Sequence, residues 1–268
     1  MRSGFTILTI VLSTGGLAAA DLHSSSQPII AGAPSGAADD AVVLLVAFNQ
    51  QQSLSRTCTA TLVAPNLVLT ARHCVAAVSA GTYSCASDGS LAEGPGGTVM
   101  ADRAPADLYV MPPGSALPTV TAASLVSAPR GVRLFVPDDA DVCAGDLALL
   151  ELDRELDAPA IALRLDRPPA RGEAFAAIGW GVTDSGPGLP AQRHRRDGVV
   201  TTRVGPRTQP GLAASEFEAG ESTCHGDSGG PAIAASGAVL GVAARGGNGT
   251  VDPANPARDC TDPGYRGT

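Results

Sequence analysis

Short apolar runs separated by turn-forming residues restrict the fold of this chain more than any other feature of its sequence. The runs are rich in aliphatic and β-branched residues and are bounded by Gly, Pro, Asp or Asn, which is the pattern of short β-strands. The chain has 32 glycines and 21 prolines and no long helical periodicity, which argues against a helical bundle. The sequence therefore predicts an all-β barrel or sandwich. The expected strands are 58–63, 67–70, 146–153, 174–180, 198–204, 230–235 and 238–246.

Composition limits which residue types can form the core and which partners the chain can bind. Hydrophobic residues make up 44% of the chain and aromatic residues only 3%, so the core must consist of Ala, Val and Leu. The net charge is −8, and the one short basic cluster, Arg193 to Arg196, is interpreted as a solvated loop. Nucleic acid is therefore a poor partner. The Gly/Pro/Ser-rich segments 81–101 and 184–191 are expected to be exposed loops, and 157–171 is expected to link two halves of the chain.

The first 20 residues have the pattern of a secretory signal peptide. Arg2 gives a positive start, residues 5–12 are apolar, and Ala18 to Ala20 offer small residues for cleavage. The apolar run is too short to span a membrane. The alternative is a buried N-terminal helix. We expect export, to the periplasm or the extracellular space, and no membrane association after signal removal.

Export changes the interpretation of the six cysteines. An even number in a secreted chain suggests three disulfides. No two cysteines have the CxxC spacing that would favour zinc. No metal and no cofactor are expected, and composition alone leaves the pairing open.

Two candidate catalytic residues follow or open predicted strands. Of the four histidines, His23 and His194 are expected at the surface, whereas His73 lies in "LTARHC" directly after a strand. A disulfide between Cys58 and Cys74 would hold the loop that carries His73, with a stabilisation of about 3 kcal/mol. Asp146 opens the apolar run "DLALLELD", and a carboxylate at the mouth of a buried strand needs a partner such as an imidazole N–H. The alternatives are a structural histidine and a turn-capping aspartate.

The stretch "TCHGDSGGPAI" contains the candidate nucleophile. Ser228 lies between Asp227 and two glycines. In isolation such a run is only a turn, because Gly, Asp and Ser each favour turns. Its meaning depends on the rest of the chain.

Together, His73, Asp146 and Ser228 occur in an order and in motifs that resemble the chymotrypsin-like (trypsin-fold) serine endopeptidases, with a secreted, bacterial-type member as the expected kind. The resemblance covers residues 29 to about 265, and five motifs in the family's order make it specific. These motifs are "IIAG", "TARHC", "DLALL", "GWG" and "CHGDSGGP".

The resemblance implies a fold and a domain organisation. The fold would be two six-stranded antiparallel Greek-key β-barrels with the active site between them, and the C-terminal strand and helix of the family look incomplete here. The signal peptide would be 1–20, a short propeptide 21–28 and the peptidase domain 29–268. The first barrel would span about 29–157 and the second about 158–268.

The resemblance also implies roles for the motif residues. Ser228 would be the nucleophile, His73 the general base and Asp146 the residue that orients the imidazole. The backbone N–H groups of Gly226 and Ser228 would form the oxyanion hole. Asp227 would pair with a new α-amino group at Ile29 after activation. By analogy the disulfides would be Cys58–Cys74 and Cys224–Cys260, and Cys85–Cys143 would remain as the third.

Several positions depart from the family pattern. The residue before Ile29 is Pro28 and not a basic residue, and Arg245 replaces an apolar residue of the substrate cleft. The expected base of the specificity pocket is Ser222, where trypsin-type enzymes have Asp, so the pocket would lack a charge for Lys or Arg and would favour an apolar or aromatic side chain. Selectivity for small side chains, or broad selectivity, is an alternative. Arg245 would favour acidic substrate residues if it reaches the cleft, and would have no effect if it points to solvent. The expected pocket residues are Ser222, Thr223, Arg245, Gly246 and Gly264.

There are three alternatives to an active peptidase of this family. A non-catalytic binding protein of the same fold normally lacks a catalytic residue, and a truncated chain of this family would fold poorly. An α/β-hydrolase would have Ser in GxSxG and His last in the chain, the reverse of the order here, which excludes it. The expected partners are protein or peptide substrates and protein inhibitors of proteases, and the expected state is a monomer.

Overall fold

The computed structural model describes residues 29–49, 53–143, 145–182, 189–205, 211–247, 256–261 and 265–268. The predicted signal peptide and propeptide, His23 and the pocket residue Gly264 lie outside these residues. No helix of the described segments is long and apolar enough to cross a membrane.

The first sheet forms a six-stranded barrel. Its two end strands meet through an antiparallel bridge between Tyr109 and Arg130, and Val110 N–H donates to the carbonyl of Pro129 at 2.9 Å. The sheet is therefore closed and leaves few unpaired edges. In order, the strands are β10 (Gly131–Phe135), β11 (Ala148–Leu152), β4 (Leu67–Thr70), β3 (Ser53–Ala64), β2 (Val42–Asn49) and β9 (Leu108–Val110).

The second sheet also curls into a barrel, because residues 243 and 244 form backbone hydrogen bonds to two separate parts of the sheet. Ala243 N–H donates to the carbonyl of Gly230, directly before β15, while the next N–H, that of Ala244, donates to Thr268 beside β18. The sheet order is β16 (Val239–Val242), β15 (Pro231–Ala234), β12 (Ala174–Gly179), β13 (His194–Val204), β14 (Phe217–Ala219), β18 (Arg266–Gly267) and β17 (Gly246–Gly247), and β1 (Ala33–Pro34) pairs with β13. The prediction of an all-β fold with two barrels is confirmed.

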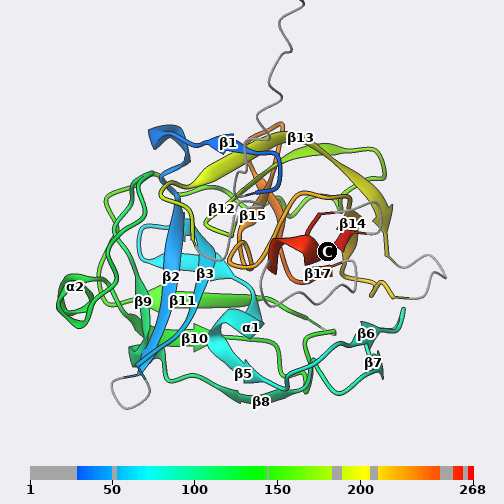
Figure 1. Cartoon of the computed structure of the whole chain (residues 1–268), viewed down its shortest axis with the longest axis horizontal. Coiled ribbons are helices and arrows are strands. Elements are labelled where there is room, and N and C mark those ends of the chain that lie inside the picture. The colour runs from blue at the N-terminus through cyan, green and yellow to red at the C-terminus, as the bar shows by residue number, and fades with distance from the viewer. Residues whose placement is uncertain are drawn as a thin grey trace, which may run out of the picture.

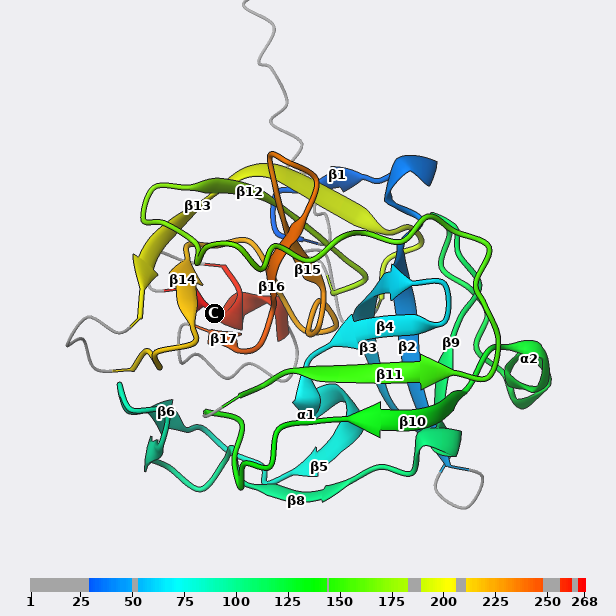
Figure 2. The ribbon, with the colours of Figure 1, turned by 180° about the vertical axis from the view of Figure 1, so that it is seen from behind.

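Helices are few and short in the described segments. The α-helices are α1 (Arg72–Val75) and α2 (Ala122–Ser127), and 3₁₀ turns cover Ala37–Asp39, Pro105–Asp107 and Pro256–Asp259. Two small hairpins pair β5 (Ala76–Val78) with β8 (Val99–Asp102) and β6 (Ser84–Cys85) with β7 (Leu91–Glu93). Figures 1 and 2 show the two barrels side by side, with α1 on the side of the first barrel that faces the second.

The largest apolar cluster contains residues of both barrels and fixes their relative position. The largest buried cluster contains Leu62 and Leu150 from the first barrel together with Ile178 and Ile233 from the second. It is composed almost entirely of Ala, Val, Leu and Ile, as the scarcity of aromatic residues predicts. Because the packing is continuous across the interface, loops at the ends of both barrels meet at a defined place.

Three disulfides are present, of which the family resemblance implied two and the third joins the two cysteines that remained. They are Cys58–Cys74, Cys85–Cys143 and Cys224–Cys260, and no free cysteine remains. The first links β3 to α1, and the third links the segment before Ser228 to the C-terminal 3₁₀ turn.

The prediction of a solvated basic loop at Arg193–Arg196 is wrong. Arg193 has an exposed fraction of 0% and donates to Ser35, Asp40 and three backbone carbonyls, while its guanidinium also lies over the ring of Trp180. His194, expected at the surface, is buried, and burial lowers its pKa. The cluster opens β13 and joins the N-terminal segment to the second barrel. Its basic side chains have partners within the chain, which the sequence pattern alone did not reveal.

The prediction of an exposed loop at 81–101 is confirmed for exposure, since most of these residues are exposed, but it is wrong for a loop. This segment contains β6, β7 and the start of β8, and Cys85, Gly89, Gly96 and Gly97 are buried. The second predicted loop, 184–191, lies mostly outside the described residues.

Candidate active site

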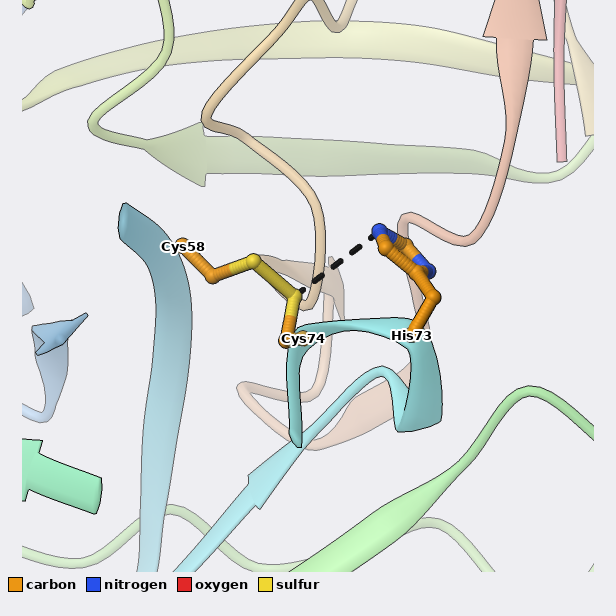
Figure 3. Close-up of side chains that lie close together, drawn as sticks. All are labelled: Cys58, His73 and Cys74. Atoms are coloured by element: carbon orange, nitrogen blue, oxygen red, sulfur yellow. Dashed lines mark hydrogen bonds between the residues drawn. A yellow bond between two sulfur atoms is a disulfide. The ribbon is translucent and has the colours of Figure 1, made fainter. Parts of the chain in front are cut away.

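His73 lies on the single turn of α1, directly after β4. The disulfide between Cys58 and Cys74 holds this turn against β3. Figure 3 shows the His73 ring beside this disulfide, with Nε2 at 3.8 Å from Cys74 Sγ. Arg56 donates to the His73 carbonyl at 2.8 Å. The imidazole is thus presented by a short, cross-linked turn.

Asp146 contacts His73 twice. One carboxylate oxygen accepts the His73 backbone N–H at 2.8 Å, and the other contacts the ring nitrogen Nδ1 at 2.7 Å. The Asp146 carboxylate is buried, with 5% of the side chain exposed. Since an ionised carboxylate only accepts hydrogen bonds, Nδ1 carries the proton and Nε2 is left as the basic nitrogen. The ring is therefore oriented and held in one tautomer.

Ser228 occupies a tight turn between β14 and β15 that only glycines permit. Gly229 has a φ of +78°, and a Cβ there would lie 2.1 Å from Thr70 Oγ1. A Cβ on Gly230 would lie 2.6 Å from the Ile178 carbonyl. The turn is thus pressed against both barrels, and its glycines are required by close approach and not merely by turn preference.

Within the segment 226–230, two amides have no acceptor in the described part of the chain. The backbone N–H groups of Cys224, Asp227, Gly229 and Gly230 all donate within the chain, whereas those of Gly226 and Ser228 do not. The preceding carbonyl, of His225, accepts the N–H of Val182 at 2.6 Å. Because the C=O and N–H of a trans peptide point in opposite directions, the Gly226 N–H points away from Val182. These two free donors can bind an oxygen anion at the turn.

Asp227 points away from the nucleophile into the second barrel. It is fully buried and accepts the backbone N–H groups of Gly181 at 2.7 Å and Cys224 at 2.8 Å, together with that of Ile29. Burial raises its pKa to about 7, against these hydrogen bonds. A Cβ on Gly179 or Gly181 would collide with the Asp227 carboxylate, which explains the "GWG" sequence.

The nucleophile and base are neighbours but are not bonded to each other in this structure. The Ser228 carbonyl accepts the Thr59 N–H at 2.9 Å and lies 3.6 Å from Cys74 Sγ, next to His73. The Ser228 hydroxyl makes no hydrogen bond to His73 Nε2. In ligand-free active sites such bonds are commonly long and tighten with substrate.

A pocket of about 180 Å³ opens beside Ser228. No carboxylate lines it among the described residues, and its polar groups include the hydroxyls of Thr223 and Tyr265, which are 2.9 Å apart. Gly246 forms one wall, where a Cβ would lie 2.4 Å from the Tyr265 hydroxyl oxygen. The lining residues are Thr223, Cys224, His225, Ser228, Ala243, Ala244, Arg245, Gly246, Cys260 and Tyr265.

Of the predicted pocket residues that the structure describes, three line the pocket and one does not. Thr223 and Gly246 line the pocket as expected, whereas Ser222 lines an adjoining apolar cavity and donates its hydroxyl to the Gly220 carbonyl at 3.0 Å. Arg245 lines the pocket, but its guanidinium is bound to Glu216 at 2.5 and 2.9 Å and to a backbone carbonyl. Neither alternative for Arg245, a free cation in the cleft or one in solvent, describes this arrangement.

Sequence reasoning missed Thr59 and Tyr265. The Thr59 hydroxyl donates to the Gly226 carbonyl at 2.9 Å and accepts the Trp180 N–H at 3.1 Å, so it ties the Ser228 turn to the "GWG" segment. Nothing in the sequence around Thr59 signals this role, apart from its position next to Cys58. Tyr265 was used only to mark the end of the family resemblance.

No described group suits a metal ion. The two clusters of His and Cys side chains, around His73 and around His225, consist of a histidine and the two sulfurs of a disulfide. Disulfide sulfurs are not thiolate ligands.

The comparison with protein families agrees with this geometry. A family model described as a trypsin-like peptidase domain matches residues 58–242, which contain His73, Asp146 and Ser228. The chain belongs to this family.

The trypsin-like peptidase domain resembles curated relatives over part of their length. It is 33% identical to trypsin alpha-4 of Lucilia cuprina over 110 residues, which are 36% of this chain and 42% of the relative. It is 31% identical to kallikrein 1-related peptidase b22 of Mus musculus over 133 residues, which are 46% and 51% of the two chains. The chain thus spans about half the length of the curated relatives it matches. Both relatives are animal proteins, so the bacterial type stays a prediction.

Solved structures share the fold of this trypsin-like domain. Human heparin binding protein matches with a TM-score of 0.54 at 19% identity, covering 81% of this chain and 85% of that one. Neuropsin, a serine protease expressed in the limbic system of mouse brain, matches with a TM-score of 0.54 at 19% identity, covering 89% and 92%. At this identity the comparison establishes the fold alone.

Proposed function

We propose that this protein is a serine endopeptidase that hydrolyses peptide bonds through an acyl-enzyme. Ser228 Oγ attacks the scissile carbonyl carbon while His73 Nε2 takes its proton. The same imidazole then returns the proton to the leaving amine, and water repeats the sequence to release the acyl group. Asp146 keeps the proton on Nδ1 and stabilises the imidazolium.

The observation that carries the proposal is the pair of unpartnered amides at Gly226 and Ser228. Gly226 and Ser228 are both partly exposed, and their N–H groups are not used within the chain, so both donors are accessible to a ligand oxygen. Beside a serine hydroxyl they can bind the oxyanion that forms in acyl transfer, where one such donor is typically worth about 10²–10³ in rate. A non-catalytic binding protein has less support, because all three triad residues are present and the imidazole is oriented.

Titration with a fluorophosphonate tests the proposal directly. The reagent should label one site per molecule, and Ser228→Ala should abolish both labelling and peptidase activity, with a loss of about 10⁴-fold or more. Ser236→Ala, in an exposed turn of the same barrel, is the matched control and should retain both. Normal cleavage by Ser228→Ala would rule out this nucleophile.

The primary specificity proposed is for apolar or aromatic side chains. A substrate Lys or Arg would lose water in the pocket beside Ser228 without meeting a carboxylate, which costs several kcal/mol at a buried site. Arg245 does not supply a free cation for acidic substrates, because Glu216 holds it. A peptide library varied at the residue before the cut measures this preference, and dominant cleavage after Arg or Lys would contradict it.

Activation and export complete the proposal. The peptidase is exported by the signal 1–20, loses the propeptide 21–28 by cleavage after Pro28, and acts as a monomer outside the cytoplasm on protein or peptide substrates, under the control of protein inhibitors. Ile29 is fully buried beside Asp227 and has a φ of +46°, which is a strained value for a β-branched residue. This strain exists only while the peptide bond to Pro28 is intact. N-terminal sequencing of the active form should give Ile29. An active enzyme beginning at Asp21 contradicts this route.

A further inference from the structure

A second, larger cavity of about 530 Å³ lies between the segment that leads into the β6–β7 hairpin and the second barrel, next to the pocket beside Ser228. Gly81, Thr82 and Tyr83 line one side of it. The strand segment that contains Arg245, Gly246 and Gly247 lines the other. Since Arg245 and Gly246 also line the pocket beside Ser228, a chain that enters the pocket can continue into the larger cavity.

Tyr83 is held in place by the glycines of its own hairpin. The ring packs on backbone at Gly97, where a Cβ would lie 2.9 Å from the ring atom Cδ2. Gly94 approaches the Thr82 carbonyl so closely that a Cβ would lie 2.1 Å from its oxygen. The two arms around β6 and β7 are therefore in direct backbone contact, and the position of the ring is fixed.

The hairpin is also joined to the loop that leads to Asp146. The disulfide Cys85–Cys143 links them, and Val142 N–H donates to the Gly97 carbonyl at 3.0 Å. Val99 N–H donates to the Ala140 carbonyl at 2.9 Å. In Figures 1 and 2 the β6–β7 hairpin stands apart from the six-stranded sheet and faces the end of the second barrel that carries β14 and β17. Tyr83 is thus a fixed wall of the cleft.

Charges around this cavity balance one another. Arg245 pairs with Glu216 at 2.5 Å, and Arg203 pairs with Glu218 at 3.0 Å. The other charged lining residues, Asp259 and Arg266, contribute one charge of each sign. Burial, reinforced by the nearby Asp146 carboxylate, raises the pKa of Tyr83 to about 12, so its hydroxyl is neutral at physiological pH. Tyr83 is the one aromatic residue among the described residues that line the cavity, so its ring is the surface that an apolar substrate group can cover.

We propose that Tyr83 is a specificity-determining residue, whose ring contacts an aliphatic or aromatic substrate side chain that lies outside the pocket beside Ser228. The proposal rests on the peptidase function and deepens it. The substrate would lie extended between Tyr83 and the segment Arg245–Gly247. Peptides with such an apolar side chain two to four residues from the one held in the pocket are the substrates of choice.

Peptide series that keep the pocket residue constant test this subsite. Each series carries Leu or Ala at one of the neighbouring positions, and kcat/KM is measured for both. For the wild type, Leu should exceed Ala by about tenfold at one position. Tyr83→Ala should reduce this ratio to about one, and Tyr83→Phe should preserve it, because the ring is retained.

A second variant avoids loss of hairpin packing. Thr82 is exposed and lines the cavity, so Thr82→Trp fills the space without removing a buried group, and it should also abolish the Leu preference. Phe135→Ala, an exposed aromatic residue on β10 that does not line this cavity, is the matched control and should retain the preference. A wild type without Leu preference at any position, or variants at 82 and 83 that both keep it, overturns the subsite. A wild type that does not react with a fluorophosphonate instead overturns the peptidase function itself.

Discussion

Asp146 accepts two hydrogen bonds from His73, one from its backbone N–H at 2.8 Å and one from ring Nδ1 at 2.7 Å. Two contacts to one residue fix both the position and the tautomer of the imidazole. Only the tautomer with a proton on Nδ1 leaves Nε2 free to take the proton of Ser228.

Asp146→Asn should lower kcat by about 10⁴-fold while the fold is retained. The Asn side chain has one acceptor oxygen and one NH₂ group. If the oxygen keeps the His73 N–H, the NH₂ group faces Nδ1 and favours the tautomer with a proton on Nε2, which cannot act as a base. Steady-state kinetics measure the fall in kcat, and near-UV circular dichroism shows whether the fold is retained. Activity within tenfold of the wild type would show that the tautomer is not controlled by this carboxylate.

Thr59→Val tests a positioning residue that does not touch the reacting atoms. Loss of the hydroxyl leaves the Gly226 carbonyl and the Trp180 N–H without their partner, at a cost of about 1–3 kcal/mol in stability. Because Gly226 carries one of the two free amides, kcat should fall while KM changes little. Thr59→Ser keeps the hydroxyl and should restore kcat. Urea denaturation and kinetics of both variants separate stability from positioning, and equal kcat values for Val and Ser would contradict the role.

Gly229→Ala should destabilise the protein far more than Gly237→Ala. Both glycines have positive φ, +78° and +84°, so the conformational strain is similar. At Gly229 a Cβ meets Thr70 Oγ1 at 2.1 Å and the Thr59 carbonyl oxygen at 2.4 Å, whereas at Gly237 nothing lies within 4 Å. We expect a loss of about 3 kcal/mol or more at Gly229 and about 1 kcal/mol at Gly237. Urea denaturation measures both, and similar losses would mean that the Ser228 turn can move away from the first barrel.

The stability of the uncleaved chain should fall as pH rises from 3.8 towards 7. Burial raises the folded-state pKa of Asp227 from 3.8 to about 7, so in this range the folded chain keeps a proton that the unfolded chain has lost. Cleavage before Ile29 would supply an ammonium group that pairs with the carboxylate, and the fall should then disappear. Melting temperatures at pH 5 and pH 7, for uncleaved and cleaved forms of the Ser228→Ala variant, measure this difference. The same pH dependence in both forms would exclude an ion pair between Ile29 and Asp227.

The chain order of motifs was enough to predict the fold class and the candidate triad. The motifs are a serine between Asp and two glycines, a histidine after a strand and an aspartate before another strand. Each is a local pattern that reflects a local requirement. Gly229 illustrates this, because its φ of +78° lies in the left-handed region that favours glycine. Strand 67–70 was predicted to the residue, since its apolar run is bounded by turn residues on one side and by α1 on the other.

Contacts between segments far apart in the sequence were decided only by the tertiary structure. Arg193 looked like part of a solvated cluster, yet it is buried because Asp40 and three backbone carbonyls from distant segments surround it. Arg245 was open to two interpretations until Glu216 was found beside it. Local sequence determines which backbone shapes and side-chain chemistries are possible, whereas the partner of a charge or hydroxyl depends on how the two barrels pack, and that packing is set by the shared apolar core.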